Sequence, residues 1–265
     1  MRSCVLVTRP QPQADEWVAR LEALGQPAFA LPLLAIEPLR ADDPALQAAW
    51  RALPALRLVM FVSPNAVASF MAARLAGGAW PDGVLAGATG PGTVAALRAA
   101  QVPEAAIAAP QPDAAQFDAE TLWRHRLSSE AWAGRRVLVV RATEGRDWLS
   151  QTLQAAGAEV EALAAYRRVT PRWSPAQCER LRQVAERPTD HAWLFSSSEA
   201  IAQLPALLDG HGLPGVFEAL RACPALATHP RIAATARGAG FAEVQGVAPD
   251  PAQVAQRLGG GAAAS

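Results

Sequence analysis

The strongest constraint on this chain is that its sequence repeats itself. Three pairs of segments match in the same order: 5–9 with 137–141, 58–66 with 192–200, and 92–98 with 231–237. The first pair reads VLVTR and VLVVR, and at the same offset Gly25 returns as Gly157. Self-similarity at a nearly fixed offset is typical of a duplicated structural unit. The sequence therefore predicts two copies of one supersecondary arrangement.

Each copy alternates short apolar runs with stretches whose apolar residues recur at helical spacing. Apolar runs of four or five residues are typical of buried parallel strands, whereas Trp17, Leu21 and Leu24 mark one face of a helix. Gly25 and Gly157 stand where a helix favours a left-handed C-terminal residue. Alternating strands and helices predict an α/β protein with parallel sheets, for which flavodoxin-like units are the simplest topology.

The same periodicity places the remaining elements. Helices are expected near residues 44–53, 64–75, 91–99, 114–126, 174–186, 198–208, 230–238 and 251–258, and strands near 84–87, 105–108, 224–227 and 242–245. Two extended, proline-bounded stretches, 31–39 and 163–171, follow the repeated unit. Each is either a linker that carries the chain between two lobes or an ordinary last strand, and periodicity leaves both open.

The residue types exclude several kinds of chemistry. The chain has no lysine, and all 24 basic residues are arginine. This excludes pyridoxal-phosphate and Schiff-base enzymes and P-loop nucleotide hydrolases, which need a lysine amine. The four histidines lack the HxH and HExxH spacings of metal sites, and the three cysteines are isolated. We therefore expect no metal site and a reducing compartment.

The charge balance also limits the partners. The 24 basic residues are matched by 24 acidic ones, so the chain lacks the basic excess that nucleic-acid and anionic-membrane binding usually require. No apolar run approaches the roughly 18 residues of a membrane span, and the N-terminus shows no signal-peptide pattern. We expect a cytoplasmic protein that binds neither nucleic acid nor membrane.

Polar residues follow two equivalent predicted strands. Ser63 and Asn65 flank a proline where a strand meets a helix, and Ser196 and Ser197 occupy the matching junction of the second copy. Serine before proline is also an ordinary helix start, and this structural explanation is about as good. In a doubly wound sheet, however, the carboxyl ends of the strands face the ligand, and free helix N–H groups attract carboxylates. These four residues are therefore candidates for binding an anionic ligand.

A glycine-rich segment and two arginines extend this set. Residues 86–93 match neither the GxGxxG fingerprint nor a phosphate loop, so they form either a structural turn or one that presents Gly90 and Thr93 to a ligand. Arg9 and Arg141 end equivalent strands, and arginine offers paired donors to carboxylates. For each arginine, an ordinary surface position is the alternative.

The order of these segments resembles the uroporphyrinogen-III synthase family, the cofactor-free cyclases of tetrapyrrole biosynthesis. The resemblance spans residues 5 to about 258 and rests on several short segments: VTRP at 7–10, FVSPNAV at 61–67, GPGT at 90–93, VRATEGRDWL at 140–149, Tyr166, and LFSSS at 194–198. It implies two flavodoxin-like lobes joined by a two-strand linker, with the active site in the cleft between them. It also implies a discontinuous first lobe, residues 1–36 with 170–258, a second lobe, 37–169, and a disordered tail, 259–265.

The resemblance also implies roles for individual residues. Tyr166, the only tyrosine, would assist catalysis by a hydrogen bond to a departing hydroxyl, although an interdomain or core tyrosine is the plainer explanation. The implied substrate contacts are Arg9, Ser63, Asn65, Gly90, Thr93, Arg141, Gly145, Arg146, Ser196, Ser197 and His229. The second copy departs from the family at 229–232, where HPRI replaces GPGT, so no threonine role passes to Ile232.

The implied reaction converts hydroxymethylbilane, a linear tetrapyrrole, to uroporphyrinogen III. Water is lost, and the last ring is inverted through a spiro intermediate. Because the linear chain closes by itself to the uninverted isomer, the protein mainly folds and orients its substrate, without metal or cofactor. We expect a monomer whose pathway neighbour is hydroxymethylbilane synthase. The rival interpretation is a two-lobed small-molecule binding protein without enzymatic activity.

Overall fold

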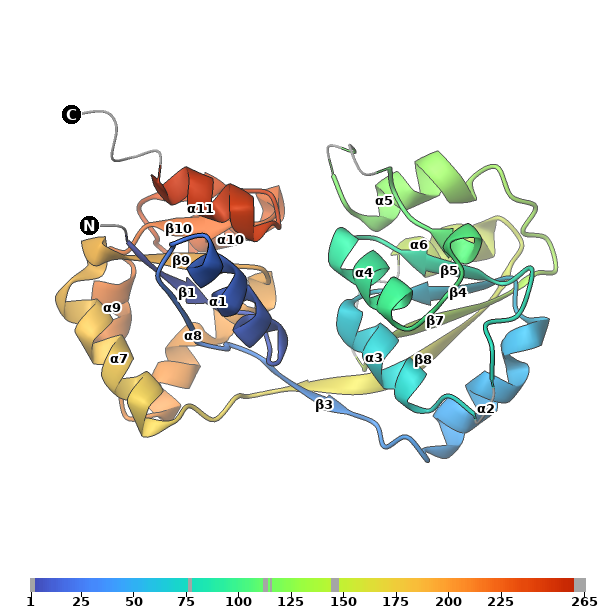
Figure 1. The fold of residues 1–265 in the computed structure, drawn as a ribbon, viewed down its shortest axis with the longest axis horizontal. Coiled ribbons are helices and arrows are strands. Elements are labelled where there is room, and N and C mark those ends of the chain that lie inside the picture. Colours follow the sequence, from blue (N-terminus) through green and yellow to red (C-terminus); the bar gives the residue numbers. More distant parts are fainter. Residues whose placement is uncertain (1–2, 76–77, 112–113, 115, 144–147, 260–265) are drawn as a thin grey trace. The chain divides into compact units, whose positions relative to one another are not determined.

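The chain folds into two α/β units, each built on its own sheet (Figure 1). The computed structural model describes residues 3–75, 78–111, 114, 116–143 and 148–259. Unit 1 comprises Met1–Ala35 with Val169–Ser265, and unit 2 comprises Ile36–Arg168. The predicted fold class, α/β with two parallel-sheet lobes, is confirmed.

Unit 1 has a five-stranded sheet in the order β11-β10-β9-β1-β2, with parallel neighbours throughout. Counted along the unit, this order is 2-1-3-4-5, that of flavodoxin-like sheets. Its elements are β1 (Cys4–Val7), α1 (Gln13–Ala23), β2 (Ala28–Ala30), α7 (Pro175–Glu186), β9 (His191–Phe195), α8 (Ser198–Gly210), α9 (Val216–Leu220), β10 (Ala225–Ala227), α10 (Pro230–Gly238), β11 (Val244–Gly246) and α11 (Pro251–Gly259).

Unit 2 has a six-stranded sheet in the order β3-β8-β7-β4-β5-β6. Its elements are β3 (Ala35–Pro38), α2 (Pro44–Ala52), β4 (Leu58–Phe61), α3 (Pro64–Ala72), β5 (Leu85–Ala88), α4 (Pro91–Ala99), β6 (Ile107–Ala108), α5 (Ala119–Leu122), a π-helical turn (Trp123–Leu127), β7 (Arg136–Ala142), α6 (Trp148–Ala155) and β8 (Glu159–Val169). Counted from β7, the strands again follow the order 2-1-3-4-5, with β3 added beside β8.

The two sequence copies do not coincide with the two units. The first copy gives β1 and β2 to unit 1 but β4, β5 and β6 to unit 2. The second copy gives β7 and β8 to unit 2 and β9, β10 and β11 to unit 1. Each unit therefore joins the first half of one copy to the second half of the other, which explains why unit 1 is discontinuous.

Helices cover both faces of each sheet (Figure 1). Successive strand residues point to opposite faces, so β1 contributes Leu6 to one hydrophobic cluster, and Val5 and Val7 to another. In unit 2, β4 likewise divides its four buried residues, with Phe61 on one face and Met60 on the other. A strand buried on both faces reads as a continuous apolar run, which is why these strands were recognisable in the sequence.

Several local expectations are confirmed and one is wrong. Gly25 and Gly157 have φ values of +71° and +91°, as expected for left-handed helix ends. The helix expected over 114–126 is wrong in extent, because the α-helix covers only Ala119–Leu122 before the backbone widens into the π-helical turn. The two extended stretches are both partly sheet strands, β3 and β8, and the chain changes unit within each. Gly259 closes α11, and residues 260–265 of the expected tail lie outside the described residues.

Candidate functional site

Ser63 and Tyr166 meet at the carboxyl edge of the unit 2 sheet. Ser63 is the N-cap of α3, and its Oγ accepts the N–H of Ala66 at 3.2 Å. Pro64 follows at the first helical position, where its fixed φ favours the helix start. Ser63 Oγ also lies 2.8 Å from Tyr166 Oη, and either hydroxyl can donate this hydrogen bond. Ser63 is thus both a helix cap and the partner of the only tyrosine.

A bulge in β8 aims Tyr166 at this edge. The β7–β8 ladder shifts register after Arg141 and leaves Ala165 as an extra residue on β8. A bulge re-aims the side chains that follow it, and here Ala165 and Tyr166 are both buried. The Tyr166 side chain is 2% exposed and lies in the same hydrophobic cluster as Phe61, whereas Ser63 is partly exposed. The tyrosine ring is therefore a core residue whose hydroxyl ends at a partly exposed serine.

The loop after β5 brings Gly90 and Thr93 to the same edge. A Cβ on Gly92 would lie 3.6 Å from the Pro64 ring, so the first turns of α3 and α4 lie side by side. Gly90 is the N-cap of α4, and at φ −142° it is in an extended conformation that any residue adopts. A Cβ there would meet no atom within 4 Å, so neither the backbone conformation nor the available space requires glycine at this position. The glycine instead leaves the start of α4 without a side-chain cap, beside the buried Thr93.

The corresponding edge of unit 1 carries Ser196, Ser197 and His229. Ser197 caps α8, and its Oγ accepts a first-turn N–H at 3.3 Å. His229 caps α10, because its Nδ1 accepts the N–H of Arg231 at 3.1 Å. His229 thus caps its helix with a side chain, whereas Gly90 at the equivalent position does not. This capping explains in structural terms why a histidine can stand at 229 in place of glycine. Ile232, the residue equivalent to Thr93 in the second repeat, is 6% exposed and belongs to the unit 1 core.

The two equivalent arginines differ in their surroundings. Arg9 follows β1, with its Cζ 4.5 Å from the centroid of the Trp17 ring, and burial lowers the pKa of its guanidinium to about 10. Arg141 lies near the end of β7 and is partly buried. The structure thus brings the predicted residues to two edges, one in each unit: Arg9, Ser196, Ser197 and His229 in unit 1, and Ser63, Asn65, Gly90, Thr93, Arg141 and Tyr166 in unit 2. Gly145 and Arg146 lie outside the described residues.

Three residues at these edges were missed in the sequence. Val62 and Trp148 follow β4 and β7, and both side chains are 38% exposed although they are large and apolar. Ser198 opens α8, and its Oγ is buried without a hydrogen-bond partner. Trp148 stands in the VRATEGRDWL segment and could have been singled out there, but the sequence did not show that its side chain is exposed. Apolar surface beside polar groups suits a ligand that carries both aromatic rings and charges.

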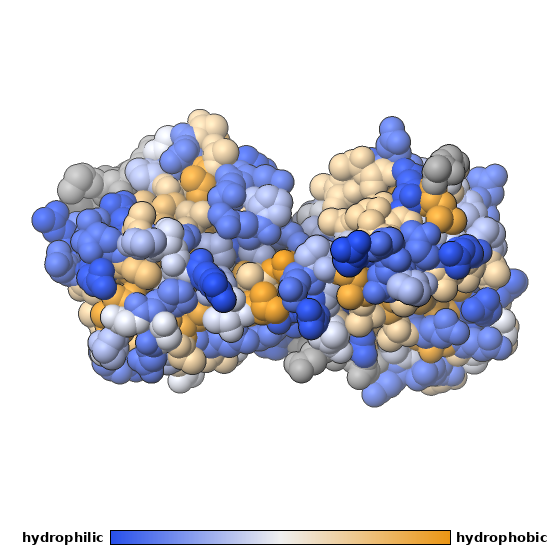
Figure 2. Space-filling view, turned by 90° about the horizontal axis from the view of Figure 1, so that it is seen from below, coloured by the Kyte–Doolittle hydropathy of each residue, from blue (hydrophilic) through white to orange (hydrophobic). Residues whose placement is uncertain are grey.

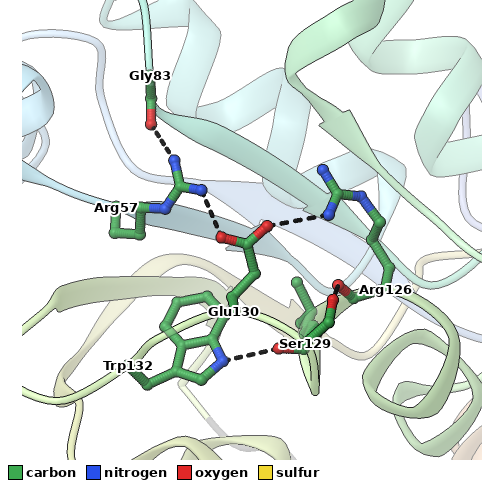
Figure 3. Close-up of polar contacts among 7 residues, drawn as sticks. Arg57, Gly83, Arg126, Ser129, Glu130 and Trp132 are labelled. Carbon is green, nitrogen blue, oxygen red and sulfur yellow. Dashed lines mark hydrogen bonds and ion pairs between the residues drawn. The ribbon is translucent and has the colours of Figure 1, made fainter.

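A polar pocket of about 440 Å³ opens at the opposite, amino edge of the unit 2 sheet. Glu130 lies between two arginines there, with its Oε2 2.5 Å from Arg57 Nη2 and its Oε1 3.0 Å from Arg126 Nη1 (Figure 3). Arg57 also donates to Gly83 O at 2.7 Å. The Arg57 hydrogen bond, aided by Arg126, holds the pKa of the Glu130 carboxyl below its usual range. These charges already satisfy one another, so we interpret this network as structural.

The face shown in Figure 2 is mainly hydrophilic, with its apolar residues in small separate groups. Among residues 3–259 that the structure describes, no helix combines the length and apolar character needed to cross a membrane. In the same residues, no three His, Cys, Asp or Glu side chains form a group that could hold a metal ion.

Comparison with known proteins identifies the family. The model of the family described as Uroporphyrinogen-III synthase HemD matches residues 15–255, most of the chain. The chain belongs to the uroporphyrinogen-III synthase family. The resemblance seen in the short sequence segments is thereby confirmed.

Individual relatives agree with this family assignment. The curated uroporphyrinogen-III synthase of Escherichia coli is 31% identical over 245 residues, which cover 91% of this chain and 93% of that protein. The Salmonella typhimurium protein of the same name is 33% identical over 175 residues, 65% of this chain and 68% of its own length.

Solved structures share the fold. A mutant uroporphyrinogen III synthase from Thermus thermophilus is 20% identical, with a TM-score of 0.58 over 98% of this chain and 97% of that chain. The Helicobacter pylori uroporphyrinogen-III synthetase is 16% identical, with a TM-score of 0.50 over 99% of each chain. At these sequence identities, the two solved structures support the α/β fold and nothing further.

Proposed function

We propose that the hydroxyl pair of Ser63 and Tyr166 is the catalytic centre of this chain. The chain is a lyase of tetrapyrrole biosynthesis that cyclises hydroxymethylbilane to uroporphyrinogen III. The single observation that supports the assignment is the 2.8 Å contact between Ser63 Oγ and Tyr166 Oη at the carboxyl edge of the sheet. This edge is where doubly wound α/β units bind their ligands.

The helix cap gives the hydroxyl pair a direction. Ser63 Oγ already accepts the N–H of Ala66, while its own hydrogen remains free to be donated. In the proposed arrangement Ser63 donates that hydrogen to Tyr166 Oη. The phenolic hydrogen is then available to the hydroxyl group that leaves the substrate. Ser63 is thus a positioning residue, and Tyr166 is the hydrogen-bond donor.

The surroundings of the pair fit the substrate class. Hydroxymethylbilane carries acetate and propionate groups on four pyrrole rings. The start of α4 has no side-chain cap at Gly90. The N–H groups of Thr93 and Val94 donate to Gly90 O, and the N–H of Gly92 is suited to a carboxylate. The buried Thr93, with Asn65 and Arg141, adds polar groups at the same edge, and the exposed Val62 and Trp148 add apolar surface for pyrrole rings. We also assign substrate contacts to Gly145 and Arg146, which lie outside the described residues.

The proposed steps need no external oxidant or reductant. Electrons of a pyrrole nitrogen expel the terminal hydroxyl, which takes up a proton and leaves as water, assisted by Tyr166. The resulting azafulvene is attacked by the substituted carbon of the last ring, and this new C–C bond closes the spiro intermediate. The original C–C bond from the spiro carbon to its methylene bridge then breaks. The released methylene bonds to the unsubstituted α-carbon on the other side of the ring nitrogen, and loss of the proton from that carbon restores the pyrrole. The protein contributes mainly by holding the reacting carbons in register.

The remaining expectations concern the setting of the reaction. The chain acts on a tetrapyrrole substrate. We propose that it works as a cytoplasmic monomer, that hydroxymethylbilane synthase is its pathway neighbour, and that nucleic acid is not a partner. The balanced charge and the short apolar runs support this setting. Analytical ultracentrifugation of the purified chain, alone and mixed with that synthase, would test the monomer and the partnership.

A coupled assay tests the proposed function. Hydroxymethylbilane is generated enzymatically, the products are oxidised, and the type I and type III isomers are separated by chromatography. We expect type III product to depend on this protein. Tyr166→Phe keeps the buried ring and removes one hydroxyl, and we expect it to lower kcat roughly 100-fold, within the range of general-acid assistance. Type I product alone would overturn the cyclase. Wild-type kcat in Tyr166→Phe would overturn only the role of the phenol.

A further inference from the structure

The bulge that aims Tyr166 leaves one buried carbonyl group outside the β7–β8 ladder. The register of that ladder passes from Ala164 directly to Tyr166, so Ala165 has no partner residue on β7. Ala165 is completely buried. A buried carbonyl oxygen without a hydrogen-bond donor is unfavourable. A bulge at this position therefore needs a donor from outside β7.

The segment that begins with β3 supplies this donor. The N–H of Leu39, the residue after β3, donates to Ala165 O at 2.9 Å. The Leu39 side chain packs against the hydrophobic cluster that contains Ala165 and Tyr166. From the β7 side of β8, the N–H of Thr143 donates to Tyr166 O at 3.3 Å. The backbone around Tyr166 is thus held from both sides of β8.

A side-chain contact agrees with this alignment of β3 on β8. Glu37 Oε2 lies 2.8 Å from Arg167 Nη2. The contacts of Glu37 with Arg167 and of Leu39 with Ala165 fit one antiparallel alignment, in which Tyr166 lies between the two. Both side chains of the ion pair are more than half exposed, so the pair adds little stability. The Leu39 hydrogen bond, which is made to a buried carbonyl, is therefore the more important of the two contacts.

Unit 1 offers an independent comparison. The strand of unit 1 that corresponds to β8 is β2, which is the last strand of its sheet in the described part of the chain. Unit 1 also has no tyrosine, since Tyr166 is the only one in the sequence. The added strand and the tyrosine thus occur together, in unit 2.

We propose that β3 and Leu39 form a positioning element, which holds the Ala165 bulge in place and so keeps the Tyr166 hydroxyl at Ser63. This inference rests on the proposed function, in which Tyr166 donates to the leaving hydroxyl group. Leu39 acts through the tyrosine and not by contact with the substrate. Loss of its N–H should therefore lower kcat and change KM little, because a small displacement of a catalytic group slows the chemical step.

The test compares Leu39→Pro with Leu39→Ala. Both changes remove the leucine side chain, but only proline also removes the backbone donor. β3 is the last strand of its sheet, where proline is tolerated better than inside a sheet. We expect the kcat of Leu39→Pro to lie roughly tenfold below that of Leu39→Ala, a smaller loss than the roughly 100-fold expected when the phenolic hydroxyl is removed. The KM values of the two variants for hydroxymethylbilane should agree within about threefold.

Two further readouts distinguish positioning from plain stabilisation. In the Tyr166→Phe background, Leu39→Pro and Leu39→Ala should have equal kcat, because the hydroxyl group that is positioned has gone. The chain has one tyrosine, so fluorine NMR of protein labelled with fluorotyrosine reports on position 166 alone. We expect this signal to be shifted or doubled in Leu39→Pro compared with Leu39→Ala.

If Leu39→Pro does not fold, the exposed ion pair provides the test. Glu37→Arg places like charges opposite each other, and the double variant that adds Arg167→Glu restores an opposite pair. We expect kcat to fall about threefold in the single variant and to recover in the double variant, as suits an exposed ion pair. An unchanged kcat in Glu37→Arg, or a loss that the double variant does not reverse, would overturn the positioning element.

The outcomes separate this proposal from the proposed function. A wild-type protein that yields only type I product would remove the cyclase itself, and wild-type kcat in Tyr166→Phe would remove the role of the phenol. Equal kcat in Leu39→Pro and Leu39→Ala would overturn the positioning element alone. A difference between them that persists in the Tyr166→Phe background would also overturn it, because β3 would then be a structural support.

Discussion

The two units carry the same junctions at their carboxyl edges but use them differently. Ser63 and Ser197 cap equivalent helices, yet only Ser63 also meets a tyrosine. At the offset that relates Gly25 to Gly157, the position of Tyr166 is taken by Leu34, which is buried in the unit 1 core. The duplicated serine in unit 1 therefore has no equivalent phenol to position.

The second junction differs in the same sense. In unit 2, Gly90 leaves the start of α4 without a side-chain cap and Thr93 follows it, whereas in unit 1 His229 caps α10 and Ile232 fills the core. In unit 1, Arg9 Nε is buried without a hydrogen-bond partner in the described part of the chain. The duplication thus supplied two similar edges, of which the edge of unit 2 carries the hydroxyl pair.

The largest expected effect comes from exchanging the third residue of the two helix starts. Ile232→Thr removes buried apolar surface and places a hydroxyl in the unit 1 core, so we expect a loss of about 2–4 kcal/mol in the free energy of unfolding. Thr93→Val replaces the hydroxyl by a methyl group of similar size, so stability should change by no more than about 1 kcal/mol, the scale of one hydrogen bond, while type III production falls. Urea unfolding and the isomer assay measure the two quantities. A stable Ile232→Thr protein would show that packing does not explain the difference between the units.

A smaller effect separates the two capping serines. Ser63→Ala and Ser197→Ala each remove one helix cap, which is worth about 1 kcal/mol of stability in both cases. Only Ser63→Ala also removes the partner of Tyr166, and we expect its kcat to fall roughly tenfold, or about 1.4 kcal/mol in the barrier. The measurements are thermal unfolding and kcat for both variants. Equal kcat values would mean that Ser63 is a cap and nothing more.

Much of this arrangement was accessible from the sequence, because strands buried on both faces leave continuous apolar runs. The runs at β1, β4, β7 and β9, and the prolines at the first helical positions, marked most of the junctions at which the candidate residues lie. The connectivity of the two units could not be predicted in the same way. Repeated segments alone do not reveal that each unit combines halves of different copies. That information lies in strand pairing between residues far apart in the chain.

The candidate site was accessible as a set of positions but not as a set of contacts. The sequence placed Ser63 and Tyr166 on a common list, yet their hydrogen bond depends on a bulge at Ala165 that no local pattern announces. The missing hydrogen-bond partner of Arg9 Nε likewise depends on its surroundings. In the sequence, Arg9 and Arg141 look alike, because each ends a predicted strand. The sequence gives the residue types at the site. Which of their polar atoms form hydrogen bonds depends on how the folded chain packs around them.

The smallest expected effect tests the opposite edges of the two sheets. In unit 2 the amino edge is held by the Arg57–Glu130–Arg126 network, whereas in unit 1 a neutral contact, Gln26 Nε2 to Ser3 O at 2.5 Å, lies at that edge. The folded-state pKa of Glu130 is lowered below its ordinary value of 4.5. Its contribution to stability is therefore complete above pH 4.5 and is lost as the pH falls through the folded-state pKa.

Glu130→Gln should accordingly cost about 1 kcal/mol near neutral pH, a modest value because the carboxylate is partly exposed. The difference from the wild type should shrink as the pH falls below 4.5 and disappear below the folded-state pKa, where the wild-type carboxylate is itself protonated. Gln26→Ala in unit 1 is the matched control, because its cost should not depend on pH over the same range. Hydrogen exchange followed by mass spectrometry measures the two units separately. The expectation is that acid increases hydrogen exchange at the amino edge of unit 2, where ionic contacts lie, and not at that of unit 1. Faster exchange in acid in unit 1 but not in unit 2 would contradict it.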